Sequence, residues 1–336
     1  LPVRKESLKG SSTMAWMRAA RRLGLLLLGV VLLAIVPTVA ASEDTVAFTI
    51  NDTRISESSG LAVDPSSSLY WTVNDSGDRG VAYGIGLDGT VQGTLNFRAQ
   101  PRDVEAVAVY GDQLYVADIG DNTRKRRFVR VYFFTNPRAN GLTVTYQAYD
   151  FRYPDGPHDA ETLLVDESGR LFIVTKGQDA AIYEAPANPK RRSVNELEKV
   201  GSAPSNVTDG LFLPGGESIA LLTYSSVQVI DATKYQVVIS APIPEQPQAE
   251  SLTLSLDQSS LLVGSEGKRS KVYSMPVPSD ASPTPTPGDG PAAESDVPES
   301  QANSWQSQRG TLLALGLAGF VALVAGIVVA LVRRPS

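Results

Sequence analysis

The sequence repeats one pattern five times: a short strand-like run, a tight turn and a second apolar run that returns along the first. The first runs cover residues 59–63, 105–109, 161–165, 209–213 and 250–254, and the second runs cover 69–73, 114–117, 171–174, 218–222 and 261–264. Successive repeats begin 46, 56, 48 and 41 residues apart. A period of roughly 40 to 50 residues made only of strands is the signature of a β-propeller, so we predict an all-β fold.

Further strand-like runs set the number of blades. The first four repeats each contain two more runs, at 81–87 and 91–97, 128–134 and 142–149, 181–184 and 197–201, and 226–230 and 236–241. The fifth repeat has only one more, at 271–275. Residues 45–50 precede the first repeat without a partner, so we predict that they form the outer strand of the last blade and close the ring. Six blades would leave about 39 residues each, shorter than every observed interval, so the prediction is a five-bladed propeller over residues 45–277.

The two ends of the sequence predict a membrane-anchored, exported protein. Residues 1–41 contain a basic segment, an apolar run and small residues, the pattern of a secretory signal. Residues 312–332 are 21 residues without a charge, long enough for a transmembrane helix, and two arginines follow at once. The Pro- and Ser-rich residues 278–310 predict a disordered tether. We therefore expect a single-pass protein of the cell membrane, with the propeller extracytoplasmic and residues 333–336 cytoplasmic.

Charge and cysteine content narrow the chemistry. The chain has a formal net charge of −6, and without residues 1–42 and 333–336 it carries 22 basic and 35 acidic residues, or −13. So acidic a surface disfavours nucleic acid as a partner and favours divalent cations. The chain has no cysteine, which excludes disulfides and thiol chemistry.

The repeat also predicts a site. The inner strand of each blade is followed by an antiparallel partner, so the start of the first strand and the end of the second lie on one face of the ring. Five strand-opening residues should therefore surround one end of the central channel: Ser59, Glu105, Glu161, Asp209 and Glu250. Four carboxylates this close need a cation or a proton, and Ca²⁺ accepts six to eight oxygen ligands in flexible geometry. We predict an axial calcium site on these five residues; the alternative is that the acids pair with Arg or Lys, or accept backbone amides.

The loops that follow the second strands should lie on the same face and bring basic and polar groups to it. The predicted ligand-binding residues in these loops are Asp75, Arg79, Asn122, Arg124, Lys176 and Lys268. A cation beside a basic rim indicates a small anionic ligand, with phosphate or carboxylate groups, or a component of the cell envelope. The basic run 125–127 fits a solvated loop tip equally well.

These residues carry a resemblance. The ring of strand-opening residues resembles that of the calcium-activated nucleotidase (apyrase) family, five-bladed propellers with a central calcium; the family has serine at the fourth position, where this chain has Asp209. Residues 57–62 and 74–79 are similar to the first repeat of bacterial phytase-like and esterase-like propellers. Residues 118–122 with 159–161 are similar to actinobacterial members of that set. The resemblance covers roughly residues 45–277 and implies a bacterial source, the propeller fold and a metal.

Two classes of function stay open. The single histidine, His158, fits a polar contact at the entry to the third blade better than a catalytic base or metal ligand. No Gly-x-Ser-x-Gly elbow or P-loop is present. A binding module is therefore the first hypothesis. The second is a calcium-dependent phosphohydrolase acting on nucleotide- or phytate-like substrates, with Asp118 or Asp121 as the proton acceptor and Arg124 or Lys176 stabilising charge.

Overall fold

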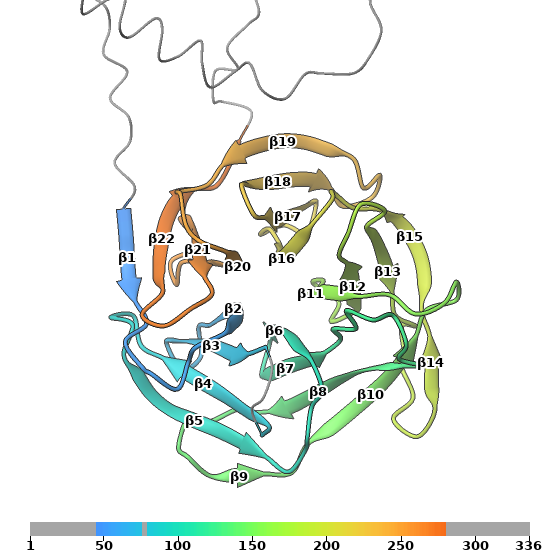
Figure 1. The fold of residues 1–336 in the computed structure, drawn as a ribbon, viewed down its shortest axis with the longest axis horizontal. Coiled ribbons are helices and arrows are strands. Elements are labelled where there is room, and N and C mark those ends of the chain that lie inside the picture. The colour runs from blue at the N-terminus through green and yellow to red at the C-terminus, as the bar shows by residue number, and fades with distance from the viewer. Residues whose placement is uncertain (1–44, 76–78, 280–336) are drawn as a thin grey trace, which may run out of the picture. The chain divides into compact units, whose positions relative to one another are not determined.

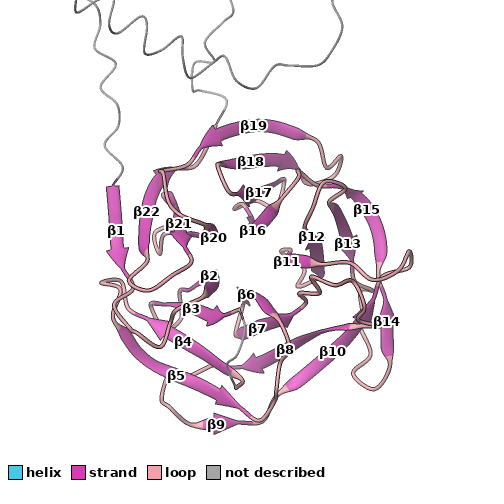
Figure 2. Ribbon diagram, viewed as in Figure 1, coloured by secondary structure: helices cyan, strands magenta, loops and turns pink. Residues whose placement is uncertain are grey.

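The computed structural model describes residues 45–75 and 79–279, which form a five-bladed, all-β propeller (Figure 1). The described residues contain strands and loops without a helix (Figure 2), so this part of the chain offers no helix able to cross a bilayer. The predicted signal segment (1–41), almost all of the tether (278–310), the predicted span (312–332) and the tail (333–336) lie outside the described residues.

Each blade is a sheet whose first strand lines the central axis. Blade 1 contains β2 (Ser58–Asp64), β3 (Leu69–Asn74), β4 (Val81–Ile85), β5 (Val91–Phe97) and β9 (Thr143–Val144). Blade 2 contains β6 (Val104–Tyr110), β7 (Gln113–Asp118), β8 (Val129–Thr135), β10 (Gln147–Arg152) and β14 (Val194–Glu196). Blade 3 contains β11 (Ala160–Val165), β12 (Leu171–Thr175), β13 (Ala181–Glu184) and β15 (Glu198–Ser202). Blade 4 contains β16 (Val207–Phe212), β17 (Ser218–Thr223), β18 (Ser226–Asp231) and β19 (Val237–Pro242).

Blade 5 is built from both ends of the described chain. It contains β20 (Ala249–Leu254), β21 (Ser260–Ser265), β22 (Lys271–Pro276) and β1 (Thr45–Thr49). Strand β1 pairs antiparallel with β22, with Thr45 opposite Ser274 and Thr49 opposite Lys271. The predicted ring closure by the N-terminal strand is therefore confirmed.

The outer edges of blades 1 and 2 differ from the prediction. The sequence predicted one strand over 142–149, but the chain divides there: β9 pairs in parallel with β5 of blade 1, and β10 pairs with β8 of blade 2. In the same way β14 crosses from the third repeat to pair in parallel with β10. Both short strands cover an edge that would otherwise present unpaired backbone groups, which a search for alternating apolar residues does not detect.

The hydrophobic core consists of seams between neighbouring blades. Trp71 and Phe97 of blade 1 pack with Tyr132 and Phe134 of blade 2 in one such seam. Comparable clusters join blades 2 and 3, 3 and 4, 4 and 5, and 5 and 1. Because every seam is apolar and the inner strands are tightly packed, the ring is a rigid frame that fixes the strand ends around its axis.

Candidate functional site

The openings of the inner strands meet the ends of the second strands at one mouth of the channel. Val104 pairs with Asp118, Ala160 with Thr175, and Ala249 with Ser265. Deeper along the axis the inner strands line the channel with apolar side chains such as Leu61, Val107 and Leu163. Polar chemistry is thus concentrated at this mouth, as the repeat predicted.

A polar cavity of about 180 Å³ lies at the mouth, and we call it the axial pocket. It brings together four of the five predicted metal ligands: Ser59, Glu105, Glu161 and Glu250. Three predicted ligand-binding residues also line it: Asp75, Asn122 and Lys176. Its remaining lining residues were not predicted: Glu57, Ser58, Gln248 and Glu266.

A bulge at the start of every inner strand turns one residue out of the ladder. The bulged residues are Gly60, Glu105, Glu161, Thr208 and Glu250. A bulge re-aims its side chain, and here it directs three glutamates into the axial pocket. These glutamates are only 3, 4 and 5 % exposed, respectively, so their carboxyl groups are held inside the protein.

Blade 4 breaks the series. Thr208 takes the bulge, and its hydroxyl donates to the backbone carbonyl of Ala249 at 2.7 Å. The predicted ligand Asp209 is one residue further on, outside the axial pocket. Its carboxylate oxygens accept the backbone amides of Leu252 at 2.6 Å and Gly210 at 2.8 Å, and the Leu61 amide as well. Asp209 therefore links blades 4, 5 and 1 by accepting backbone amides. This is the alternative that the sequence left open beside a role as calcium ligand.

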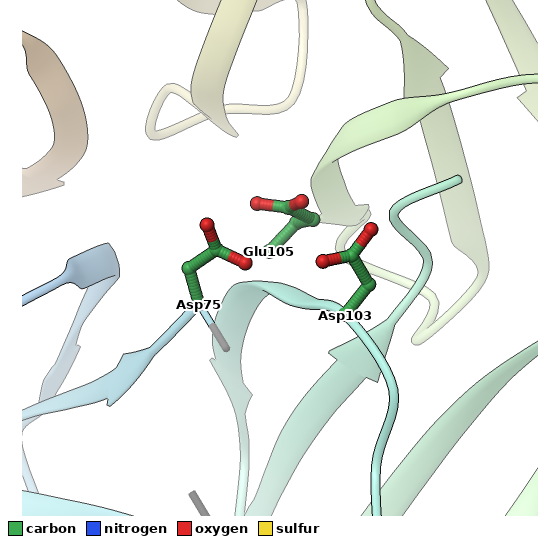
Figure 3. Close-up of side chains that lie close together, drawn as sticks. All are labelled: Asp75, Asp103 and Glu105. Atoms are coloured by element: carbon green, nitrogen blue, oxygen red, sulfur yellow. The ribbon is translucent and has the colours of Figure 1, made fainter. Parts of the chain in front are cut away.

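Three carboxylates converge on the blade 1 and blade 2 side of the mouth (Figure 3). One oxygen from each of Asp75, Asp103 and Glu105 lies within 4.8 Å of the others. Gly120 makes this approach possible: a Cβ there would lie 2.6 Å from Asp103 Oδ2 and closer still to Glu105 Oε1. Among the described residues nothing donates a hydrogen bond to the buried Asp75 Oδ1. The cluster can hold one metal ion.

Burial and mutual repulsion raise the pKa values of these acids. Burial, then the charge of Glu161, raises the pKa of Glu105 to about 10. Burial and the charge of Asp103 raise the pKa of Asp75 to about 7. Burial also raises the pKa of Asp103 and of Glu250. The mouth thus holds acids that either retain protons near neutral pH or require a positive charge.

Lys176 supplies one positive charge on the blade 3 and blade 4 side. Its ammonium group lies 2.7 Å from Glu161 Oε1 and 5.4 Å from the centre of the Tyr224 ring. Burial lowers the pKa of Lys176, but Glu161 outweighs it and the pKa is raised. Burial raises the pKa of Glu161 to about 8 despite this lysine. Lys176 is the one basic residue among the described residues that line the axial pocket. The negative charge of the pocket is therefore offset only on the blade 3 and blade 4 side.

Several predicted residues lie away from the axial pocket. Arg79, Arg124 and Lys268 are exposed and do not line it. Asp118 forms a buried ion pair with Arg126 at 2.7 Å and accepts the backbone amide of Asp103. Its carboxylate is therefore committed to holding the loop.

Asp121 lines an open hollow beside the axial pocket. One of its oxygens accepts the backbone amide of Arg126 at 2.7 Å. Asn122 lines both the hollow and the axial pocket, so the two spaces are neighbours. Asp121 thus lies beside the acid cluster, within reach of a ligand that extends across Asn122.

His158 lies in an aromatic polar cluster at blade 3. Its Nε2 is 2.9 Å from Asp155 Oδ1 and 3.1 Å from the Tyr183 hydroxyl, and its ring packs edge-on against Tyr153. It is not among the residues that line the axial pocket. The polar contact that the sequence favoured for His158 is what the structure contains.

A set of backbone hydrogen bonds at the mouth positions the acids that the sequence did not predict. In four blades a residue just after the second strand donates its amide to a residue just before the inner strand: Asp75 to Glu57, Gly120 to Asp103, Lys176 to Asp159 and Glu266 to Gln248. Each pair brings another polar side chain to the mouth. Polar residues recur two or three places before the strand openings, and this signal would have revealed Glu57 and Asp103 from the sequence.

Comparisons with known proteins give only distant structural neighbours. No family model matches the chain, and no curated protein matches it. A solved gluconolactonase from Xanthomonas campestris is similar at TM-score 0.41 and 17% identity, over 68% of this chain and 89% of that one. The Cps50 (Swd1) β-propeller domain from Myceliophteria thermophila is similar at TM-score 0.40 and 13% identity, over 72% of each chain. At such low identities and TM-scores, neither neighbour transfers an activity to this chain.

Proposed function

We propose that this protein is a binding propeller whose axial pocket holds a divalent cation, calcium, and presents it to an anionic ligand or a component of the cell envelope. The observation that carries the proposal is the convergence of Asp75, Asp103 and Glu105 within 4.8 Å at the mouth, where Asp75 and Glu105 line the axial pocket and Asp103 lines the adjoining hollow. One of these oxygens is buried and accepts no hydrogen bond from the described residues. A cation would offset the burial and the mutual repulsion that raise the pKa of each of these groups.

Calcium suits this donor set better than magnesium. The pocket offers carboxylates from four neighbouring blades together with the Ser59 hydroxyl and the Asn122 amide. Ca²⁺ accepts such mixed oxygen ligands at flexible geometry, whereas Mg²⁺ requires a strict octahedron. Bound calcium keeps open positions for oxygen donors, and an anionic group of a ligand is the natural occupant.

The residues around the pocket favour binding over catalysis. His158 lies at blade 3 within its own polar cluster, and the Asp118 carboxylate is paired with Arg126.

We also propose that the propeller is extracytoplasmic and anchored by residues 312–332, which is motivated by the signal-like and span-like patterns of the sequence. Protease accessibility of the propeller on intact cells tests that location.

The first test is calcium titration of the full-length chain, followed by thermal unfolding. A calcium concentration near 100 times the dissociation constant should add about 2.7 kcal/mol of stability, which corresponds to about 8 °C in Tm. Glu105→Gln should abolish the calcium-dependent shift, because it removes a central charged ligand. A full shift in Glu105→Gln, or none in the parent chain, contradicts the proposed site.

A pair of glycine variants tests the same site without changing charge. Gly120→Ala places a methyl group against the Asp103 and Glu105 carboxylates and should weaken calcium binding about tenfold, or about 1.4 kcal/mol. Gly86→Ala is the matched control, because its Cβ meets only the flexible ends of Gln92 and Asp88 in a distant turn. Equal calcium affinity in both variants would count against the acid cluster as the site.

The alternative is a calcium-dependent phosphoesterase acting on nucleotide- or phytate-like substrates. It is motivated by Asp121, which lines the hollow that shares Asn122 with the axial pocket. There Asp121 would accept a proton while Lys125 and Arg126 face the developing charge. A panel of phosphate and carboxylic esters decides between the classes: calcium-dependent turnover that Asp121→Asn removes identifies an enzyme, and no turnover leaves the binding module.

A further inference from the structure

Blade 2 carries a second, chemically opposite cavity. It has a volume of about 370 Å³ and lies between the loop that precedes β6, the loop that follows β7, and strand β8. Five basic side chains line it, and we call this cavity the basic pocket: Arg102, Lys125, Arg126, Arg127 and Arg130. Among the described residues that line it, Asp118 is the single acid.

Two of the five cations are used to build the walls. Arg126 pairs with Asp118 at 2.7 Å and donates to the backbone carbonyls of Gly120 and Asp118. Arg130 is held by two hydrogen bonds to Asp150, at 2.6 and 2.9 Å, and lies over the rings of Phe128 and Tyr132. These contacts fix the floor of the pocket and neutralise Asp118 and Asp150.

The other three cations have no such partner. Arg102, Lys125 and Arg127 are exposed, and among the described residues none of them lies within 4.0 Å of an acidic group. The basic pocket therefore has an excess of about three positive charges on a chain whose formal net charge is −6. A local excess of this sign on an acidic protein has to attract anions from solution.

We propose that the basic pocket is a binding site for a phosphate or phosphodiester group, and that it works independently of the axial cation. Guanidinium groups donate in a planar fork that matches the oxygens of phosphate. Three uncommitted charges suit a multiply charged oxyanion better than a single carboxylate. Phe128 is 40 % exposed at the rim and provides an apolar contact for the group that carries the phosphate.

This proposal goes beyond the calcium site, because the two pockets have separate walls. The axial pocket is lined by acids with Lys176, and the basic pocket by residues 100–102 and 125–132 of blade 2 and its preceding loop. The described residues that line the two pockets do not overlap, although the open hollow shares Asn122 with the axial pocket and Arg102, Lys125 and Arg126 with the basic pocket. A chelator should therefore leave phosphate binding intact while it removes calcium.

The experiment is equilibrium dialysis of the full-length chain, in neutral detergent with and without a chelator, against inorganic phosphate and against a water-soluble, short-chain phosphatidylglycerol. Arg102→Gln combined with Lys125→Gln should weaken binding about tenfold or more, because two charge-assisted contacts are lost. The matched control combines Arg192→Gln with Lys234→Gln, two exposed residues of other loops. Tm is measured for both double variants, and it should be unchanged because the replaced side chains are exposed.

Each outcome of the dialysis either supports or overturns the proposed phosphate site. Selective weakening with free phosphate supports a soluble ligand, and selective weakening with the phospholipid alone supports a lipid headgroup. Equal weakening in the two double variants means a nonspecific charge effect and overturns the proposal. Absence of binding to both probes, or binding that disappears with the chelator, overturns it as well; the latter would assign the anion to the calcium site.

Discussion

Blades 2 and 4 present the same sequence pattern to the channel mouth and use their carboxylates in opposite ways. In blade 2 the bulge holds Glu105, whose side chain enters the axial pocket beside Asp103. In blade 4 the bulge holds Thr208, and the acid one place later, Asp209, is consumed by three backbone amides. A shift of one residue relative to the bulge thus decides whether a carboxylate is available to a ligand or holds blades together.

The contrast predicts opposite consequences for removing each acid. Replacing Asp209 should lower the free energy of unfolding and leave calcium binding intact. Replacing Glu105 should abolish calcium binding and leave the free energy of unfolding without calcium unchanged. The difference follows from hydrogen bonding and burial: Asp209 accepts buried backbone amides, whereas burial raises the pKa of Glu105 to about 10, so without calcium it is uncharged near neutral pH, as glutamine would be. Three measurements test or refine this contrast.

Replacing Asp209 should have the largest effect. Asp209→Ala leaves the amides of Leu61, Gly210 and Leu252 without their acceptor, which should cost about 3 kcal/mol and lower Tm by about 10 °C. Calorimetry with and without calcium measures the loss, and the calcium-dependent shift should stay intact. Asp209→Asn keeps a carbonyl acceptor and serves as the control. A lost calcium shift in a folded Asp209→Ala protein would erase the contrast with Glu105.

The pH dependence of stability should come next in size after the effect of Asp209→Ala. Its sign should be opposite to that of ordinary surface acids. In the folded chain the pKa of Glu105 is about 10 and that of Glu161 about 8, against 4.5 for an ordinary glutamate. The folded state therefore holds protons that the unfolded state has released, so stability is full below pH 4.5 and declines as pH rises toward 8 to 10. With chelator we expect Tm to fall by at least about 5 °C between pH 5 and 9.

Two additions sharpen the pH experiment. Calcium should flatten the decline, because it binds the deprotonated carboxylates. Glu105→Gln should flatten it without calcium, whereas the Asp121→Asn variant, whose site lies in the hollow, should follow the parent chain. A Tm that rises from pH 5 to 9 in the chelated parent chain would show that these acids are ionised at no cost to the fold.

Lys176→Gln should have the smallest effect. The substitution removes the ammonium group that pairs with Glu161 at 2.7 Å, so the chelated protein should lose about 3 °C in Tm, corresponding to about 1 kcal/mol. The stabilisation by saturating calcium should grow by a similar amount, because the cation then also serves Glu161. Lys268→Gln, an exposed lysine outside the pocket, is the control. A smaller calcium shift in Lys176→Gln would mean that Lys176 contributes to the cation site.

The frame of the fold was predictable because it depends on a periodic property. The strand pairs recur with one period, and the lone strand at residues 45–50 had nowhere else to pair. Strands β9 and β14 were missed because two or three residues that pair in parallel with an edge leave no alternation in the sequence.

The site was predictable only where its residues belong to the repeat. Ser59, Glu105, Glu161 and Glu250 share the axial pocket because each opens an inner strand. Asp209 was grouped with them because an acid before a Gly-Leu run matches the pattern, and the bulge that moves it is a hydrogen-bonding detail. Asp103 was missed because only the strand openings were searched, although it lies two residues before one of them; its approach to Glu105 also requires the missing side chain of Gly120.

The seam that closes the ring has a mechanical consequence. Thr45 lies opposite Ser274, so the chain enters β1 beside the place where it leaves β22. A force that separates these two points would load the hydrogen bonds between β1 and β22 one after another, as a zipper opens, instead of all at once in shear. Under tension we expect blade 5 to yield first, while the other four blades keep their contacts.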